Sequence, residues 1–310
     1  MICMDCRYIR ERPSGIGLVV RELVDRLPLW MPDEKFLLLK HPKAPQRLSS
    51  SANTREIVVA SEANGPATMW WLPRIVPLGG VELFHAPYNI LPAGLRMATI
   101  VTMHDVMWLS HPLWAQSPGV WGWVERGFYQ HGIRRALRAA SRIVAITEAT
   151  RSEIVHIAPD VQSRVRVLLQ GVSAVFRPSV LREEAHRDGR MRSALLPGVA
   201  RYVLTVGQYT AYKNHDLVVR AFAKAFGAEG DVHLALVQRL GRGARRLRPI
   251  ARRLGVAERV HVLPTVSEAE LVALYRGAAC LCHPSLIEGF GLPLAEAMAC
   301  GCPVVTSFRS

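Results

Sequence analysis

The segment SLIEGFGLPLAEAMACGCPVV, residues 285–305, follows the short apolar run Cys280–His283. It holds two glutamates around a glycine-rich turn. An apolar run of this length has the composition of a buried strand, so Glu288 falls just beyond the strand's carboxyl end. Gly289 and Gly291 free the backbone for close approach to a ligand, and Pro293 is a favourable first residue of a helix. The segment therefore predicts a strand, a loop and a helix in succession.

The same alternation extends through the whole chain. Apolar strands separated by amphipathic helices are typical of parallel sheets that are covered on both faces. We predict an α/β fold of two Rossmann-like domains facing a cleft, because ligands of such sheets bind beyond the carboxyl ends of the strands. The predicted strands are Ile2–Cys6, Phe36–Lys40, Glu56–Ala60, Leu83–Ala86, Thr99–Met103, Arg142–Thr147, Tyr202–Val206, Val232–Val237, Val260–Leu263, Cys280–His283 and Pro303–Thr306. The predicted helices are Gly17–Leu27, Val120–Ala140, Glu148–Ile157, His215–Phe226, Ala244–Leu254, Ser267–Gly277 and Pro293–Cys300.

The domain boundary is expected near the middle of the chain. With 310 residues, the chain is long enough for two ordinary domains. The stretch SVLREEAHRDGRMRSALLPG is charged and weakly patterned, which suits a linker. We predict an N-terminal domain over residues 1–178, a linker over 179–198 and a C-terminal domain over 199–310.

Charge and hydropathy restrict the partners. The chain has 39 Lys and Arg against 25 Asp and Glu, a formal net charge of +14, which favours anionic partners. An arginine-rich composition alone would give the same charge, since only five of the basic residues are lysine. No stretch approaches the ~18 to 20 apolar residues of a membrane span, and the first residues lack an apolar signal core. We predict a cytoplasmic protein.

Six cysteines form three close pairs: Cys3 and Cys6, Cys280 and Cys282, and Cys300 and Cys302. All lie in or beside apolar, strand-like runs. The second spaced pair that a zinc site usually shows is missing. We expect free, buried cysteines that behave as small apolar residues, and no metal site.

The two glutamates of the opening segment have two interpretations. The amides of Gly291 and Leu292 would point out of a helix N-terminus, where a phosphate binds readily. Glu288 and Glu296 would then flank that anion, matching the sugar hydroxyls and the ribose of a nucleotide sugar. Alternatively, Glu288 lies in an ordinary loop and Glu296 only favours the helix dipole.

Further segments of the chain favour the first interpretation, in which the two glutamates belong to a nucleotide-sugar site. The spacing Glu288-x7-Glu296 with its GFGLP turn resembles the donor-binding signature of retaining glycosyltransferases of family 4, which have the GT-B fold. Segments in the same order along the chain also resemble this family, and its mannosyltransferase-like members in the first half. They are MDCRYI, SGIGLVVRELVDRL, LFHAPYNILP, TMHDVMWLSHP, IVAITEATRSEI, VRVLLQGVSAVFRP, VLTVGQYTAYKN and VHVLPTVSEAELVALYRGAACLCHPS.

The resemblance implies a donor site in the second half. Glu288 would hold hydroxyls of the transferred sugar, Lys213 would bind the diphosphate, and Glu296 would accept from the ribose hydroxyls. Backbone groups around the turn would complete the site: Phe290, Gly291 and Leu292.

The resemblance also implies a contribution from the first half. His104 and Asp105 form an HD motif at the end of a predicted strand, and His104 would approach the donor sugar. The loop Ser14-Gly15-Ile16-Gly17, before the first predicted helix, would lie against the phosphates and the acceptor through Gly15 and Gly17. A Gly-x-Gly loop alone could equally be a helix N-terminal turn.

Two features depart from the family's pattern. Members usually carry an arginine close to the lysine, at one of two positions that are Gln208 and Tyr212 here. One phosphate-binding cation is therefore expected to be missing, unless Arg239 or Arg242 replaces it. The loss of one such charge-assisted contact would cost roughly 1.5–3 kcal/mol. In addition, the family normally continues well past the PVVTS segment, so we expect the second domain to be incomplete.

The implied reaction moves a hexose from a nucleoside-diphosphate sugar to a hydroxyl of a glycan or lipid-linked acceptor, with retention at the anomeric carbon. The segments LFHAPYN and TMHD favour mannose, so GDP-mannose or a UDP-sugar is the expected donor. No cofactor is implied, and no Asp-x-Asp motif at a strand end suggests a metal. Two alternatives stay open: an inactive nucleotide-sugar-binding fragment, and a GT-B nucleotide-sugar epimerase, which the first-half segments disfavour.

An anionic membrane is a further candidate partner, because basic residues lie beside aromatic ones. The alternative is a solvated helix face with ordinary core tryptophans. Nucleic acid has only the net charge in its favour and no recognisable binding module, so we do not expect it as a partner. The residues concerned are Trp108, Trp114, Trp121, Trp123, Arg134, Arg135, Arg138, Arg142 and the segment Arg239–Arg253.

Overall fold

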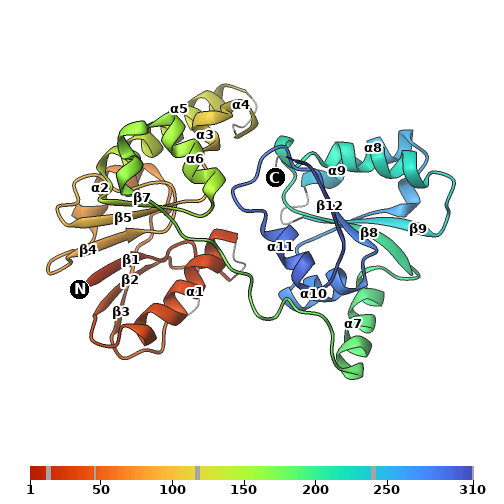
Figure 1. Cartoon of the computed structure of the whole chain (residues 1–310), viewed down its shortest axis with the longest axis horizontal. Coiled ribbons are helices and arrows are strands. Elements are labelled where there is room, and N and C mark those ends of the chain that lie inside the picture. Colours follow the sequence, from red (N-terminus) through yellow and green to blue (C-terminus); the bar gives the residue numbers. More distant parts are fainter. Residues whose placement is uncertain (12–14, 45–46, 116–118, 239–241, 309–310) are drawn as a thin grey trace. The chain divides into compact units, whose positions relative to one another are not determined.

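The chain divides into two compact units, Met1–Gln170 (unit 1) and Gly171–Ser310 (unit 2) (Figure 1). Each unit is an α/β structure around its own parallel sheet, as the sequence predicts. The computed structural model describes residues 1–11, 15–44, 47–115, 119–238 and 242–308, with the side chains of 242–244 left out.

Unit 1 contains a seven-stranded parallel sheet in the order β3-β2-β1-β4-β5-β6-β7. The strand order reverses between β1 and β4, which is the arrangement of a dinucleotide-binding fold. The strands are β1 (Ile2–Asp5), β2 (Phe36–Lys40), β3 (Thr54–Val58), β4 (Leu83–Ala86), β5 (Ala98–Met103), β6 (Arg142–Ala145) and β7 (Val165–Val167). The helices are α1 (Gly15–Trp30), α2 (Pro66–Ile75), α3 (Met107–Ser110), α4 (Pro112–Ala115), α5 (Val120–Ala139), α6 (Glu148–Ile157) and the 3-10 turn η1 (Pro159–Arg164).

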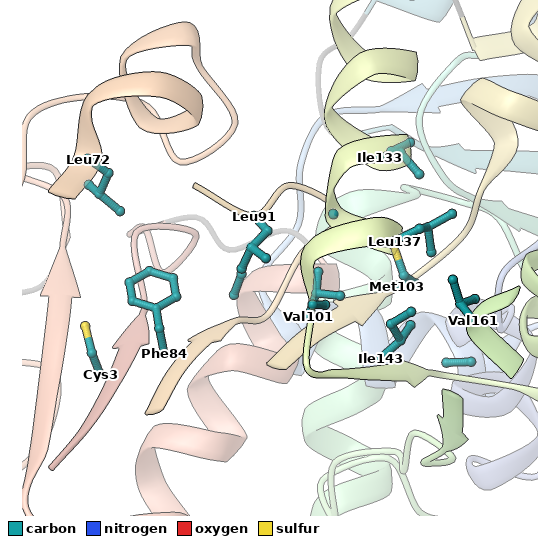
Figure 2. Close-up of a cluster of buried hydrophobic side chains, with 14 of the residues drawn as sticks. Cys3, Leu72, Phe84, Leu91, Val101, Met103, Ile133, Leu137, Ile143 and Val161 are labelled. Atoms are coloured by element: carbon teal, nitrogen blue, oxygen red, sulfur yellow. The ribbon is translucent and has the colours of Figure 1, made fainter. Parts of the chain in front are cut away.

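Alternate residues of each strand in unit 1 pack on opposite faces of the sheet. Cys3 belongs to the cluster that α2, α5 and α6 cover, whereas its neighbour Met4 packs against α1. Figure 2 shows the first cluster, in which Ile133 and Leu137 of α5 lie over Met103 of β5. These buried faces explain why the strands read as almost continuous apolar runs.

Unit 2 repeats this topology with five parallel strands in the order β10-β9-β8-β11-β12. The order reverses between β8 and β11, so the carboxyl ends of these two neighbours form the position where such sheets bind ligands. The strands are β8 (Arg201–Val206), β9 (Val232–Val237), β10 (Val260–Leu263), β11 (Cys280–His283) and β12 (Val304–Thr306). The helices are α7 (Arg182–Leu195), α8 (His215–Phe226), α9 (Arg242–Arg253), α10 (Glu268–Gly277) and α11 (Leu292–Ala299), with the 3-10 turns η2 (Ala211–Lys213) and η3 (Ala257–Arg259).

The predicted linker 179–198 is wrong, because most of it forms α7 and belongs to unit 2. Although this helix is highly charged, it docks on α10 through a buried ion pair. Arg276 donates to Asp188 at 2.9 Å, and both side chains are almost inaccessible. The division between the units follows Gln170, earlier than predicted.

The predicted loop before the first helix is also wrong, because Gly15 and Gly17 lie in the first turn of α1. Gly17, Val20, Val24 and Pro28 are the buried residues of α1. Their spacing of three to four residues makes a single helical stripe, so the buried face already begins at Gly17. Ser14 lies outside the described residues.

A buried ion pair follows the carboxyl end of β1. Arg7 donates from Nε and Nη2 to the two carboxylate oxygens of Asp5, at 2.8 and 2.6 Å, and both side chains are inaccessible to solvent. Tyr88 also donates to Asp5, and Arg7 reaches Ser61 and Thr68. This network ties the segment after β1 to the segments that follow β3 and β4.

We predict that Asp5→Asn lowers the free energy of unfolding by about 3 kcal/mol or more, since it leaves the guanidinium of Arg7 buried without its counter-charge. Denaturant unfolding measures this effect. The matched control is Glu22→Gln, which removes an exposed carboxylate 2.8 Å from Arg26 and should change stability by less than about 0.5 kcal/mol. Equal effects of the two changes would contradict the prediction.

Candidate functional site

The predicted residues Lys213 and Glu288 come together at the carboxyl ends of β8 and β11. Lys213 ends the turn η2 after β8, and Glu288 lies in the loop after β11. Lys213 Nζ lies 2.5 Å from Glu288 Oε1, and the two side chains are only 12% and 10% exposed. An ammonium and a carboxylate thus meet at the point where the strand order of unit 2 reverses.

His283, to which the sequence assigned no role, is the third member of this site. Its Nε2 lies 2.7 Å from the same oxygen, Glu288 Oε1, and its side chain is 1% exposed. It is the last residue of β11. A polar residue that ends an apolar strand, next to the motif, is the signal that could have found it.

The charge of Glu288 is set by these two neighbours. Burial alone would raise the pKa of Glu288, but the hydrogen bond from His283 and the charge of Lys213 outweigh burial and hold the pKa at about 2. Glu288 is therefore ionised at neutral pH and can only accept hydrogen bonds. It follows that the Nε2 atom of His283 carries the proton of their hydrogen bond.

The two loops of the site are tied to each other. The carbonyl of Tyr212 accepts from the Ser285 hydroxyl at 3.1 Å and from the Leu286 amide at 2.7 Å. Gly207 has φ of +145°, and a Cβ there would lie 3.7 Å from the side chain of Lys213. The two hydrogen bonds to Tyr212 hold the residue next to Lys213 against the loop that carries Glu288.

The turn before α11 presents a helix N-terminus. Gly291 is the N-cap in a left-handed conformation, with φ of 79°, and no side chain caps this end of the helix. A Cβ on Gly291 would also approach Leu294 Cδ1 to 3.1 Å, so only glycine fits without strain. Leu292 is the first helical residue, and Phe290 just before the cap is half-buried. An uncapped N-terminus of this kind favours anions.

Glu296 lies in a different environment from Glu288. It is 7% exposed, and its Oε2 accepts from the hydroxyl of Tyr275 at 2.9 Å. Burial raises the pKa of Glu296 to about 7, which the hydrogen bond from Tyr275 only partly opposes. Tyr275 was another residue without a predicted role.

In unit 1, His104 is held as a neutral imidazole. Its Nε2 lies 3.0 Å from the carbonyl of Pro87, and its Nδ1 lies 3.3 Å from Gln170 Nε2. Burial lowers the pKa of His104. Asn89 accepts from the backbone amide of His104 and donates to the carbonyl of Asp105, and so fixes the HD motif.

The positions of the expected arginine are occupied differently. Gln208 is exposed, and the ring of Tyr212 lies 5.6 Å from the Nζ atom of Lys213, a cation–π distance. Arg239 and the side chain of Arg242 lie outside the described residues.

Two buried polar atoms near these loops have no hydrogen-bond partner within the described part of the chain: Thr210 Oγ1 and Gln238 Oε1. All six cysteines are free. Among the residues described, no three His, Cys, Asp or Glu side chains gather in a way that could hold a metal ion. No helix of this part of the chain has the length and apolar character to cross a bilayer.

We predict that Glu296→Gln stabilises the protein increasingly as the pH rises from 4.5 to 7. In that interval folded Glu296 binds a proton that the unfolded chain, with a pKa near 4.5, has released, so wild-type stability falls as pH rises. The glutamine cannot ionise, and its advantage should reach up to about 3 kcal/mol at pH 8 and vanish near pH 4.5. Denaturant unfolding at several pH values tests this, and a difference that does not change with pH would contradict it.

Known proteins resemble this chain in two ways. Residues 188–309 match the family described as "Glycosyl transferases group 1". The D-inositol 3-phosphate glycosyltransferase of Mycolicibacterium smegmatis is 33% identical over 182 residues, which are 57% of this chain and 39% of that protein. The protein of the same name from Acidothermus cellulolyticus is 35% identical over 179 residues, 54% of this chain and 38% of that protein. The chain thus spans well under half the length of these relatives.

Solved structures match nearly the whole chain. WaaG, a glycosyltransferase involved in lipopolysaccharide biosynthesis, has a TM-score of 0.73 at 15% identity, over 99% of this chain and 80% of that one. HepE of Anabaena, solved in complex with UDP and glucose, has a TM-score of 0.68 at 16% identity, over 100% of this chain and 81% of that one. The chain therefore has the two-unit GT-B fold of these structures, and residues 188–309 of its second unit are similar to the group 1 glycosyltransferase family.

Proposed function

We propose that this chain is a retaining glycosyltransferase that binds a nucleoside-diphosphate sugar in unit 2 and transfers its hexose to an acceptor hydroxyl. The observation that carries the proposal is the meeting of Lys213 and Glu288 where the strand order reverses. A cation and an ionised carboxylate in one largely buried site suit the two ends of a sugar diphosphate, since one part is anionic and the other rich in hydroxyl groups.

Each group has a proposed role. Lys213 and the uncapped N-terminus of α11, at Gly291 and Leu292, bind the diphosphate. Glu288 accepts hydrogen bonds from hydroxyls of the transferred sugar, beside the backbone of Phe290. Glu296 accepts from the ribose.

In the proposed reaction, the bond between the anomeric carbon and the diphosphate oxygen breaks while the acceptor oxygen bonds to the same face of that carbon. The acceptor's proton passes to the departing diphosphate. Lys213 and the helix N-terminus stabilise the charge that develops on the leaving group, and the site acts by positioning and electrostatics.

The comparisons support this choice of substrate class. HepE was solved with UDP and glucose, and the sequence relatives are named for D-inositol 3-phosphate. Mannose is favoured by the LFHAPYN and TMHD segments alone. A glycan or lipid-linked saccharide is the proposed acceptor class, and D-inositol 3-phosphate is an acceptor worth testing directly.

The roles that the resemblance gives to residues of unit 1 are part of the same proposal. They concern His104, Asp105 and Gly15, whereas Gly17 lies in the buried face of α1 and is no longer proposed as a contact. Burial lowers the pKa of His104 and its Nε2 contacts the carbonyl of Pro87, so it would be neutral, and its Nδ1 would accept from the substrate only by giving up the contact with Gln170.

We predict that GDP-, UDP- or ADP-sugars raise the melting temperature of the wild-type chain and that Lys213→Ala weakens diphosphate binding at least about tenfold, the worth of one charge-assisted contact. Calorimetric titration with the best nucleotide measures the loss. Lys224→Ala, an exposed lysine on α8, is the matched control and should bind like the wild type. If none of these nucleotides raises the melting temperature, the donor site is wrongly assigned.

Product analysis with the best donor separates the remaining alternatives. Glu288→Gln should lower turnover far more than stability, and wild-type turnover in that variant would refute its role. Tight donor binding without any product would favour the inactive-fragment alternative, and conversion of the sugar without an acceptor would favour the epimerase.

A second part of the proposal is peripheral contact of unit 1 with an anionic membrane. Trp121 and Trp123 of α5 are 81% and 65% exposed, and the guanidinium of Arg126 lies 5.6 Å from the ring of Trp123. Trp70 of the neighbouring α2 is also exposed and packs edge-on against Phe128. Exposed indoles beside basic side chains suit the interface of an anionic bilayer.

Other residues that the sequence suggested for membrane contact do not form exposed aromatic and basic pairs. Trp108 stacks on Tyr129 and Trp114 on His111, so neither indole is fully exposed. The described arginines of α9 form a solvated helix face above a buried apolar stripe that includes Leu247. The interpretation of α9 as an ordinary solvated helix is therefore preferred.

We predict salt-sensitive flotation of the chain with vesicles that contain phosphatidylglycerol. Arg126→Gln should weaken binding about fivefold, as expected for one basic residue near the surface, and Trp121→Ser with Trp123→Ser should weaken it further. Trp30→Ser removes an exposed tryptophan at the end of α1 and is the control that should float normally. Absence of wild-type flotation, or equal losses in the control, would refute the membrane surface.

A further inference from the structure

His283 is a buried imidazole at the candidate donor site with no part in the proposed reaction. Its Nε2 and the Nζ atom of Lys213 both contact Glu288 Oε1, at 2.7 and 2.5 Å. Glu288 therefore has two donors on a single oxygen. The ammonium group of Lys213 alone would already balance the charge of Glu288. The hydrogen bond from His283 therefore needs an explanation of its own.

The explanation lies in what a diphosphate would do to this arrangement. A diphosphate that takes Lys213 competes with Glu288 for the same ammonium group. Glu288 is 10% exposed, so losing Lys213 without a substitute would leave a poorly solvated anion beside another anion. An uncompensated buried charge is costly, and the cost would be subtracted from the affinity for the diphosphate.

His283 is placed to prevent that cost. Its Nε2 hydrogen bond to Glu288 does not involve Lys213, and its ring is fixed at the end of β11 with 1% exposure. The hydrogen bond can therefore remain when Lys213 turns away. It also keeps the carboxylate in place for the sugar hydroxyls.

We propose that His283 is a positioning residue of the donor site, which holds Glu288 by its Nε2 hydrogen bond and so releases Lys213 for the diphosphate. The inference rests on the proposed function, since it takes the ligand of Lys213 to be the diphosphate of a nucleotide sugar. It predicts that His283 matters for diphosphate binding only as long as residue 288 carries a charge.

A double-mutant cycle on the full chain tests this dependence. The variants are His283→Leu, Glu288→Gln and the two combined, and the ligand is UDP or GDP, whichever stabilises the wild type more. His283→Leu should weaken diphosphate binding about tenfold, in line with one lost charge-assisted hydrogen bond. In the Glu288→Gln background the same change should weaken binding less than about twofold.

Conservative variants keep the test valid if His283→Leu does not fold. The amide nitrogen of His283→Gln reaches the position of Nε2 and should bind within about threefold of the wild type, whereas the shorter His283→Asn should lose affinity like the leucine variant. His261→Gln changes a histidine near the amino end of β10 and is the control that should leave affinity unchanged. Melting temperatures without ligand verify that every variant is folded.

The outcomes separate this inference from the proposed function. If the wild type binds neither nucleotide, the proposed function fails and the inference fails with it. If the wild type binds but His283→Leu costs the same in both backgrounds, or costs nothing, the positioning role is refuted and the donor site stands. A loss confined to the background with charged Glu288, with rescue by glutamine and not by asparagine, supports it.

Discussion

The proposed donor site of unit 2 depends on one oxygen atom, Glu288 Oε1, which is shared by a lysine and a histidine. Their combined effect outweighs burial and keeps the carboxylate ionised, with a pKa of about 2. A buried anion has to keep a partner at every step of a binding process. Any ligand that binds the ammonium group of Lys213 must therefore leave Glu288 with another hydrogen-bond donor. The rest of the site has to provide that donor.

The parallel sheet makes this sharing possible. β8 and β11 are neighbours, so the loops that follow them leave from the same edge, although Lys213 and Glu288 are 75 residues apart in the sequence. The carbonyl of Tyr212 receives hydrogen bonds from Ser285 and Leu286 and locks one loop to the other. The site is thus built on strand ends and short turns, which hold a geometry better than long loops do.

Much of the architecture could be predicted because its cause is local. Strands such as β2 and β9 are apolar runs buried almost throughout, and their bounds agree with the sequence analysis. The helix α7 was missed because its composition is charged, and its contact with α10 through Asp188 and Arg276 is a tertiary one that no local pattern shows. The first turn of α1 was missed for a related reason, since two glycines suggest a loop until the burial of Gly17 is known.

The site was only partly predictable because the properties of its residues also depend on tertiary contacts. The spacing of Glu288 and Glu296 identifies a motif, but it presents two equivalent glutamates. Their neighbours make them different, since Glu288 faces a lysine and a histidine whereas Glu296 faces the hydroxyl of Tyr275. A cation stabilises the ionised form strongly, whereas a single neutral hydroxyl does not offset burial. One glutamate is consequently a permanent anion and the other titrates near pH 7, a distinction that belongs to the folded neighbours and not to the motif.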